Sequence, residues 1–179
     1  MIGLLRFVGI LNAAVWFGAA IFLTFGVGMV PFSQEMKSLL GQANYPYFSG
    51  AIAQLFIARY LFFQIGCVMI AAMHLLAEWL YLGKHPQKLQ VGLVIGLASA
   101  VLIGACWLQP KMKALHAIKY GLNHRPEIRE AAARSFGAWH GVSQVINFLM
   151  VGGLTVYLWR ATNPSDPTRF VSAAKFTVR

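Results

Sequence analysis

The chain has 179 residues, of which 58% are hydrophobic and only 11% are Asp, Glu, Lys or Arg. A typical soluble domain carries about 25% charged residues, and one core of this size cannot hide so much apolar surface. The composition argues against a soluble enzyme, a disordered chain and a nucleic-acid-binding module. The net charge of +10 comes from basic residues that fringe long apolar runs, which favours lipid headgroups over nucleic acid as their partners.

Four apolar runs are long enough to cross a membrane, which takes about 20 residues of helix. The first run begins after Arg6 and continues through Val30, which is longer than the core of a signal peptide, so we expect a retained helix. None of the runs alternates as a strand does, and in lipid only helices or closed barrels satisfy every backbone group. The sequence therefore predicts an all-α integral membrane four-helix bundle over residues 1–160, with spans at about 7–31, 60–82, 91–108 and 142–159.

The segment between the first two spans, residues 33–56, contains Pro46 and is predicted as a surface loop. The basic tail, residues 161–179, has no predicted fold. The basic residues divide almost evenly between the two sides of the membrane, so the positive-inside rule leaves the orientation open. The short basic loop 83–88 favours cytoplasmic termini.

The main polar segment lies between the third and fourth spans. We expect the third span to continue as a helix past the membrane surface and to break at 120–123. A short surface helix is then predicted at 126–137, because Pro126 suits the first turn of a helix. This helix is expected to lie on the membrane and to turn into the fourth span near Gly137.

Small residues recur every four positions along the third span. This spacing lets two helix backbones approach closely in lipid. Packing inside the bundle is the expected role, and a seam between two copies of the chain is the alternative. The residues are Gly92, Gly96, Ala100 and Gly104.

Ionisable residues within a span are costly and suggest a function by default. His74 and Glu78 are four residues apart on the second span, so they share one helix face, and Asn12 on the first span lies in the same leaflet. One interpretation is a local His–Glu hydrogen bond. The other is a proton relay or a ligand site that opens toward the termini.

A second group of polar residues lies in the opposite leaflet, on the second, third and fourth spans. Polar side chains on facing helices hydrogen-bond across a bundle for about 1 kcal/mol each. This group therefore fits structural contacts between helices as well as it fits a ligand site. Its members are Arg59, Gln64, Gln109, His140, Ser143, Gln144 and Asn147.

The sequence predicts no cofactor and leaves a metal site open. A haem between two histidines is not expected, because His74 and His140 would differ by about 20 Å in depth at 1.5 Å per residue. A soft metal such as copper could use His116, His140, Met112 and Met36, but no pair of these residues has a recognisable metal-ligand spacing.

Several short motifs resemble one family. They include Asn12 with Trp16-Phe17-Gly18, Arg59-Tyr60, Leu108-Gln109-Pro110-Lys111-Met112, and Phe136-x-x-Trp139-His140-Gly141-x-Ser143-x-x-x-Asn147. Together they resemble the domain of unknown function 4149 family over roughly residues 5–158. The family includes proteins similar to transmembrane protein 205 and is distantly similar to the copper-resistance protein D group. The resemblance implies a compact four-helix protein, in bacteria of the inner membrane, with no established reaction.

Three functional hypotheses follow, and the sequence favours them in this order. The first is a non-enzymatic scaffold or accessory subunit of a larger membrane complex. The second is a small-ligand or metal binding or transport protein with a polar site around His140. The third is a haem or redox membrane enzyme. The expected partners are the lipid bilayer and either other membrane subunits or further copies of the chain, with no nucleic acid.

Overall fold

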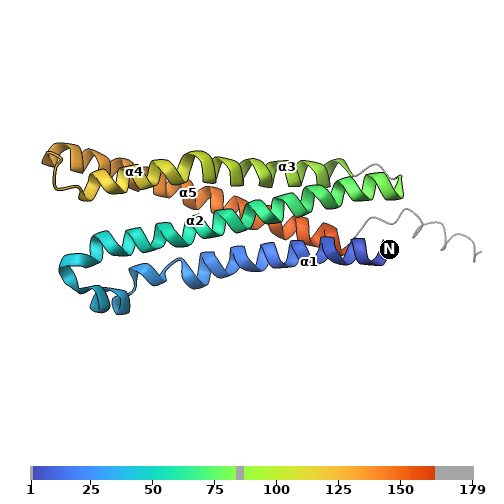
Figure 1. Cartoon of the computed structure of the whole chain (residues 1–179), viewed down its shortest axis with the longest axis horizontal. Helices are drawn as coiled ribbons and strands as arrows, with labels where there is room; N and C mark the ends of the chain where they lie inside the picture. Colours follow the sequence, from blue (N-terminus) through green and yellow to red (C-terminus); the bar gives the residue numbers. More distant parts are fainter. Residues whose placement is uncertain (1, 84–86, 164–179) are drawn as a thin grey trace, which may run out of the picture.

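The computed structural model of the chain describes residues 2–83 and 87–163, and every regular element in these ranges is a helix. Most of the predicted tail, residues 161–179, lies outside the described residues. The described helices lie side by side as long rods, and the chain reverses direction at their ends (Figure 1). The elements are α1 (Ile2–Ile21), η1 (Phe22–Val27), η2 (Val30–Phe32), α2 (Gln34–Leu82), α3 (Lys88–Ile103), η3 (Gly104–Leu108), α4 (Gln109–Tyr120) and α5 (Pro126–Thr162).

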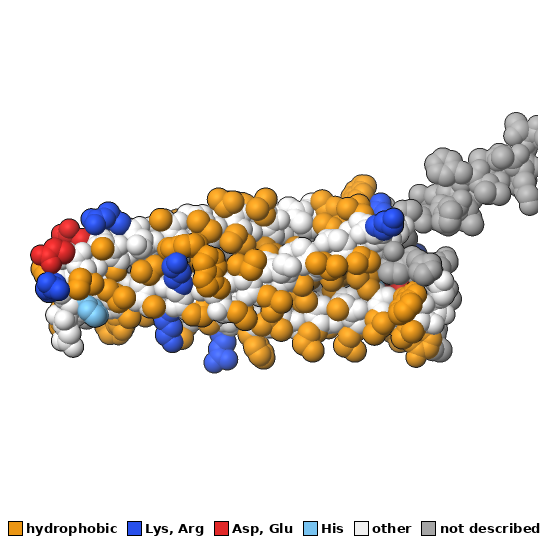
Figure 2. All heavy atoms as spheres, turned by 90° about the horizontal axis from the view of Figure 1, so that it is seen from above, with side chains coloured by type: hydrophobic (Ala, Val, Ile, Leu, Met, Phe, Trp, Pro, Cys, Tyr) orange, Lys and Arg blue, Asp and Glu red, His pale blue; other side chains and the backbone are white. Residues whose placement is uncertain are grey.

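Three helical stretches are apolar and long enough to cross a membrane, namely Gly3–Tyr81, Lys88–Tyr120 and Pro126–Thr162. The first of them includes the chain reversal between η1 and the long part of α2, which follows the kink at Gly41, and this reversal lies at the same end of the molecule as the turn between α4 and α5 (Figure 1). Large apolar side chains cover the length of the surface shown in Figure 2, whereas acidic side chains gather at one end and basic ones lie at both ends and between them. The all-helical structure and its apolar surface are those of an integral membrane protein.

Local sequence signals explain where several helices begin and end. The Ser33 hydroxyl accepts a hydrogen bond of 3.2 Å from the Met36 backbone N–H, which caps the first turn of α2. Gly83 has a φ of 60° beyond the last residue of α2, a conformation that glycine adopts without strain. Pro126 occupies the first position of α5, where a helix needs no backbone N–H from that residue.

The structure corrects two sequence expectations about the connections. Residues 33–56 are mostly helical and not a surface loop, because α2 begins at Gln34 and is interrupted by a kink at Gly41, where φ is 72° and ψ is 156°. The surface helix expected at 126–137 does not end near Gly137, because α5 runs without a break to Thr162. A glycine within a helix costs only about 1 kcal/mol, and packing of α4 along α5 supports the continuous helix.

The packed core lies in the half of the molecule near the first residues of α1 and the last residues of α5. Trp16 and Tyr157 meet there edge to face, with ring centroids 6.3 Å apart. On α1 the core residues run from Ala13 to Ala20, and on α3 they end at Val101. In the other half of the molecule, the helices are further apart and surround a cavity.

The small residues of α3 divide between the interior and the surface. Gly104 is buried, and a Cβ added to it would lie 3.1 Å from Leu61 Cδ2. Ala100 is half-buried. Gly92 and Gly96 are exposed, and no described atom outside their own helix lies within 4 Å of an added Cβ. The expected internal packing therefore does not apply to Gly92 and Gly96, which face away from the neighbouring helices.

Candidate ligand cavity

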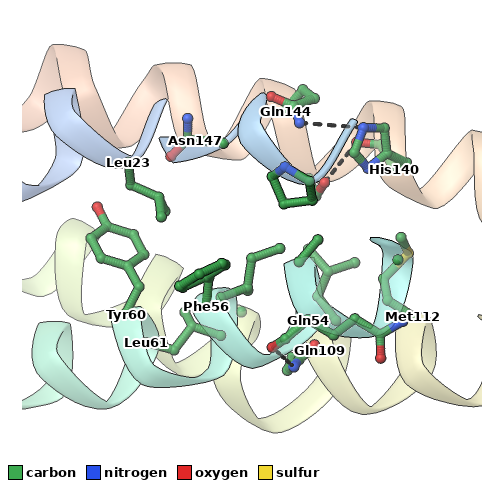
Figure 3. A pocket seen from close by; sticks show the side chains of 18 of the residues that line it. Leu23, Gln54, Phe56, Tyr60, Leu61, Gln109, Met112, His140, Gln144 and Asn147 are labelled. Carbon is green, nitrogen blue, oxygen red and sulfur yellow. Dashed lines mark hydrogen bonds between the residues drawn. The ribbon is translucent and has the colours of Figure 1, made fainter. Parts of the chain in front are cut away.

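A cavity of about 460 Å³ lies between η1 and α5 on one side and α2, η3 and α4 on the other (Figure 3). Small-molecule sites in proteins enclose about 300–1,000 Å³ and are lined mainly by apolar side chains with a few polar groups. This cavity has both properties. Its apolar wall includes Leu23, Phe56 and Leu61, whose side chains are labelled in Figure 3.

Two π-helical segments form part of the cavity wall. In η1, the Gly28 N–H bonds to the Leu23 carbonyl, five residues back, and in η3 the Gln109 N–H bonds to the Gly104 carbonyl. Such segments are rare and occur frequently at functional sites. Both begin shortly after the last core residue on their helix, which is Ala20 on α1 and Val101 on α3. The change from packed core to cavity therefore coincides with the change in helix type.

Tyr60 and Gln64 contribute polar groups from α2, one helical turn apart. The Tyr60 hydroxyl is buried and has no hydrogen-bond partner among the described residues. Its ring points from α2 toward Leu23 on the opposite side of the cavity (Figure 3). Gln64 is 3% exposed.

Asn147 and Thr24 join α5 to η1 beside the cavity. The Asn147 amide donates a hydrogen bond of 2.9 Å to the Thr24 hydroxyl, which donates in turn to the Ala20 carbonyl at 2.7 Å. Across the cavity, the Gln109 amide donates to the Gln54 carbonyl at 3.1 Å and joins α4 to α2. These polar side chains hold the walls in position.

His116 lies within aromatic residues at the outer end of the cavity. It is 5% exposed, and its ring centroid lies 5.4 Å from that of Tyr47, 4.9 Å from that of Tyr120 and 6.0 Å from that of Phe136. A Cβ at Gly50 would overlap His116 Nε2, so α2 and α4 approach this closely only because residue 50 is glycine.

The environment of His116 favours the neutral imidazole. His116 lies beyond the predicted span 91–108, where burial and the Lys119 ammonium lower its pKa below the usual value. Its buried Nε2 has no partner among the described residues.

His140 and its neighbours line the same end of the cavity from α5. The Gln144 amide lies 3.4 Å from His140 Nε2, and the Ser143 hydroxyl donates to the His140 carbonyl at 2.7 Å. The side chains of His140 and Gln144 are exposed, so this part of the wall is open to the surroundings. Both side chains are labelled in Figure 3.

The structure brings most of the predicted polar group together and leaves one member out. Arg59 is exposed and does not line the cavity. Successive residues on a helix point about 100° apart, so when Tyr60 faces the cavity its neighbour Arg59 turns outward. The predicted residues that line the cavity are Gln64, Gln109, His140, Ser143, Gln144 and Asn147.

Sequence reasoning missed other parts of the cavity. Tyr60 appeared only in a family motif, and His116 was considered only as a metal ligand. Thr24 and Lys119 were not considered as site residues, although both line the cavity. The spacing of Tyr60 from Gln64 by four residues was the available signal, because such residues share one helix face.

The group of intramembrane ionisable residues lies in the packed half and joins α1 to α2. His74 Nε2 lies 3.0 Å from the Leu5 carbonyl but 3.9 Å from Glu78 Oε1, so its hydrogen bond is with the backbone of α1. The Asn12 amide donates to the Cys67 carbonyl at 3.0 Å. The predicted His–Glu hydrogen bond is therefore replaced by contacts between helices, and none of these residues lines the cavity.

Metal-ligating side chains are sparse in the cavity. The described part of the chain contains no group of three or more His, Cys, Asp and Glu residues placed to hold a metal ion. Of the residues considered for a soft metal, His116, His140 and Met112 line the cavity and Met36 does not. The Phe136 ring lies next to both histidine rings, with centroids 6.0 Å from that of His116 and 6.2 Å from that of His140.

A family model described as a domain of unknown function (DUF4149) matches residues 11–121. The matched region includes η1, α2 and η3–α4, which form most of the cavity wall. No curated protein and no solved structure matches the chain.

Proposed function

Because the chain belongs to the DUF4149 family, whose description names no activity, we propose a function from the cavity itself. The protein is a non-enzymatic membrane protein with four helical spans, which binds a small, mostly apolar ligand between them. The observation that carries this proposal is a cavity of about 460 Å³ with largely apolar walls. Its volume and lining are those of small-molecule sites.

An aromatic cluster supports the placement of one membrane surface. The Trp107 and Trp139 rings meet at 4.8 Å between centroids, and Lys111 Nζ lies 3.9 Å from the Trp139 centroid. Tryptophan gathers at membrane–water interfaces, and lysine near a helix end extends its amine to the headgroups. With the interface at this level, α4 and the first part of α5 project beyond the membrane, and the cavity extends from the lipid region into the projecting part.

Cysteine labelling tests the four spans and the orientation, which we propose to be that of a bacterial inner-membrane protein with cytoplasmic termini. In a background without Cys67 and Cys106, a membrane-impermeant maleimide is expected to label Ser38→Cys and Lys113→Cys from outside spheroplasts. Lys88→Cys is expected to react only after the membrane is opened. Labelling of Ser38→Cys and Lys113→Cys from opposite sides would contradict four spans, and labelling of Lys88→Cys alone from outside would reverse the orientation.

Ligand binding is tested with a neutral long-chain alcohol that carries a photoreactive diazirine. In lipid nanodiscs, crosslinks to the cavity wall, mapped by mass spectrometry, are expected to saturate and to be displaced by unlabelled alcohol. Ala100→Phe places a ring in the inner end of the cavity and should weaken the displaceable crosslinks. Ser99→Phe places the same ring on the exposed face of α3 and should leave them intact. Crosslinks that neither saturate nor change in Ala100→Phe would overturn the proposal.

A scaffold role has one supporting observation, and we propose it as the second candidate. Gly92 and Gly96 are exposed along α3, which leaves its backbone open to close approach by another helix. Native mass spectrometry from lipid nanodiscs is expected to show a second copy or another subunit that Gly96→Ile removes. Gly141→Ile, at an exposed glycine of α5, is the control. A protein that is always a single chain alone would contradict this candidate.

A further inference from the structure

The charge along the cavity wall is concentrated at one end. Lys119 is the charged side chain among the described residues that line the cavity, and it lies in the last turn of α4. Ala100, on α3, lines the opposite end. The 19 positions between them correspond to about 28 Å along the helix axis at 1.5 Å per residue. The cavity therefore has a cationic end outside the membrane and an uncharged end within it.

Aromatic rings hold the Lys119 ammonium at this end. Its Nζ lies 4.9 Å from the centroid of the Tyr120 ring and 5.5 Å from that of Phe136. Such cation–π contacts attract the amine without neutralising its charge. In the described part of the chain no carboxylate forms a salt bridge with Lys119. Lys119 is half-buried, so its charge is less screened than that of a fully exposed lysine.

The cavity is elongated along the helices that line it. On α5 the lining runs from Phe136 to Met150, which corresponds to about 21 Å. A length of about 21 Å suits one extended hydrocarbon chain.

We propose that the cavity binds an amphiphile with one hydrocarbon chain and an anionic head group. The carboxylate or phosphate head lies beside Lys119, and the chain runs past Phe56 and Leu61 toward Ala100. This arrangement keeps the charged head outside the hydrocarbon region and the chain within it, as in a lipid leaflet. The inference rests on the proposed function, because it names the ligand class of the same cavity.

Competition against the photoreactive alcohol tests this inference in phosphatidylcholine nanodiscs. The competitors are hexadecanoate, hexadecanol and palmitoyl lysophosphatidate, used at about pH 8.5 so that the carboxylate is ionised. Loss of one charge interaction at a half-buried site lowers the affinity about threefold to tenfold. Hexadecanoate or the lysophosphatidate is therefore expected to compete about threefold to tenfold better than hexadecanol. A preference for only one of them identifies the head group as a carboxylate or a phosphate.

The matched variants are Lys119→Gln and Lys113→Gln, both on α4. Lys113 is exposed and does not line the cavity, so its variant controls for a general loss of positive charge. Lys119→Gln should abolish the preference for the anionic head while hexadecanol still competes, which also shows that the variant is folded. Lys113→Gln should keep the preference.

Two results would overturn this inference alone, and a third would also overturn the proposed function. Equal competition by hexadecanoate, the lysophosphatidate and hexadecanol would exclude an anionic head group, and a preference that survives in Lys119→Gln would remove the role of Lys119. In both cases amphiphile binding, and with it the proposed function, would stand. Failure of every competitor to displace the probe would overturn the proposed function together with this inference.

Discussion

Asn147 on α5 donates a side-chain hydrogen bond of 2.9 Å to the hydroxyl of Thr24 in η1, although the two residues are 123 positions apart. The same hydroxyl donates to the Ala20 carbonyl at 2.7 Å, so one side chain serves as acceptor and donor at once. In a lipid environment no bulk water replaces a lost partner. The contact fixes the distance between η1 and α5 beside the cavity.

Asn147→Leu is expected to lower the free energy of unfolding by about 0.6 kcal/mol and by no more than about 2 kcal/mol, the range of such bonds between membrane helices. Unfolding in increasing detergent denaturant measures the change, and a cycle with Thr24→Val isolates the pair. Thr155→Val removes an exposed hydroxyl that bonds within its own helix and is the control. A coupling energy of zero in the cycle would show that the bond does not form.

Gly50→Ala is expected to destabilise the protein by about 1–3 kcal/mol, because the added methyl group overlaps His116 and forces one helix to move. Gly66→Ala, on the same helix but with open space around it, should be neutral or stabilising by up to about 1 kcal/mol. Thermal unfolding measures both. The double variant Gly50→Ala/His116→Ala should recover part of the loss, and no recovery would contradict the proposed overlap.

Acid is expected to destabilise the protein through His116. Its pKa is lowered in the folded state, so below the ordinary histidine value of about 6.5 the unfolded chain binds a proton more readily and stability falls with pH. The thermal midpoint should therefore drop less between about pH 7.5 and 5.0 in His116→Gln than in the original chain. His124→Gln, at an exposed histidine, should behave like the original chain. Equal acid sensitivity in His116→Gln and the original chain would contradict this prediction.

Tyr60→Phe is expected to leave the stability of the ligand-free protein unchanged or to raise it by about 1 kcal/mol, because the buried hydroxyl has no partner among the described residues. Tyr45→Phe removes a hydroxyl that donates to the Phe32 carbonyl at 3.2 Å and should lower stability by about 1 kcal/mol. Thermal unfolding after removal of bound lipid compares the two. A clear loss of stability in Tyr60→Phe would mean that the hydroxyl already has a partner.

The sequence predicted those features that depend on single punctuating residues or on the length of apolar runs. α4 ends at Tyr120 because Gly121 follows it, and α5 begins at Pro126 because proline suits the first position of a helix; both signals are local. The family resemblance was confirmed over residues 11–121. The continuity of α5 through Gly137 was not predicted, because tertiary packing of α4 overrides a local glycine signal.

The cavity was predicted only in part. Asn147 and His140 were recognised because their stripe lies on one helix, but the rotation of α2 about its own axis is set by packing, and Arg59 was therefore placed on the wrong face. The π turns of η1 and η3 have no sequence signature of their own, so the separation of the rods was not predicted. The polar groups were predicted on the second, third and fourth spans, but only the structure shows the cavity between them.

The packed half around Trp16 and Tyr157 and the hollow half around His116 lie on the same helices and meet at a few shared residues, such as Tyr60 and Met150. Substitutions at cavity residues that make no contact between helices therefore leave the packed core around Trp16 untouched. Across a family with this plan, selection can change ligand preference at one end while the other end continues to secure folding. The position of a residue along its helix, relative to the π turn, indicates whether its replacement reaches the packed core.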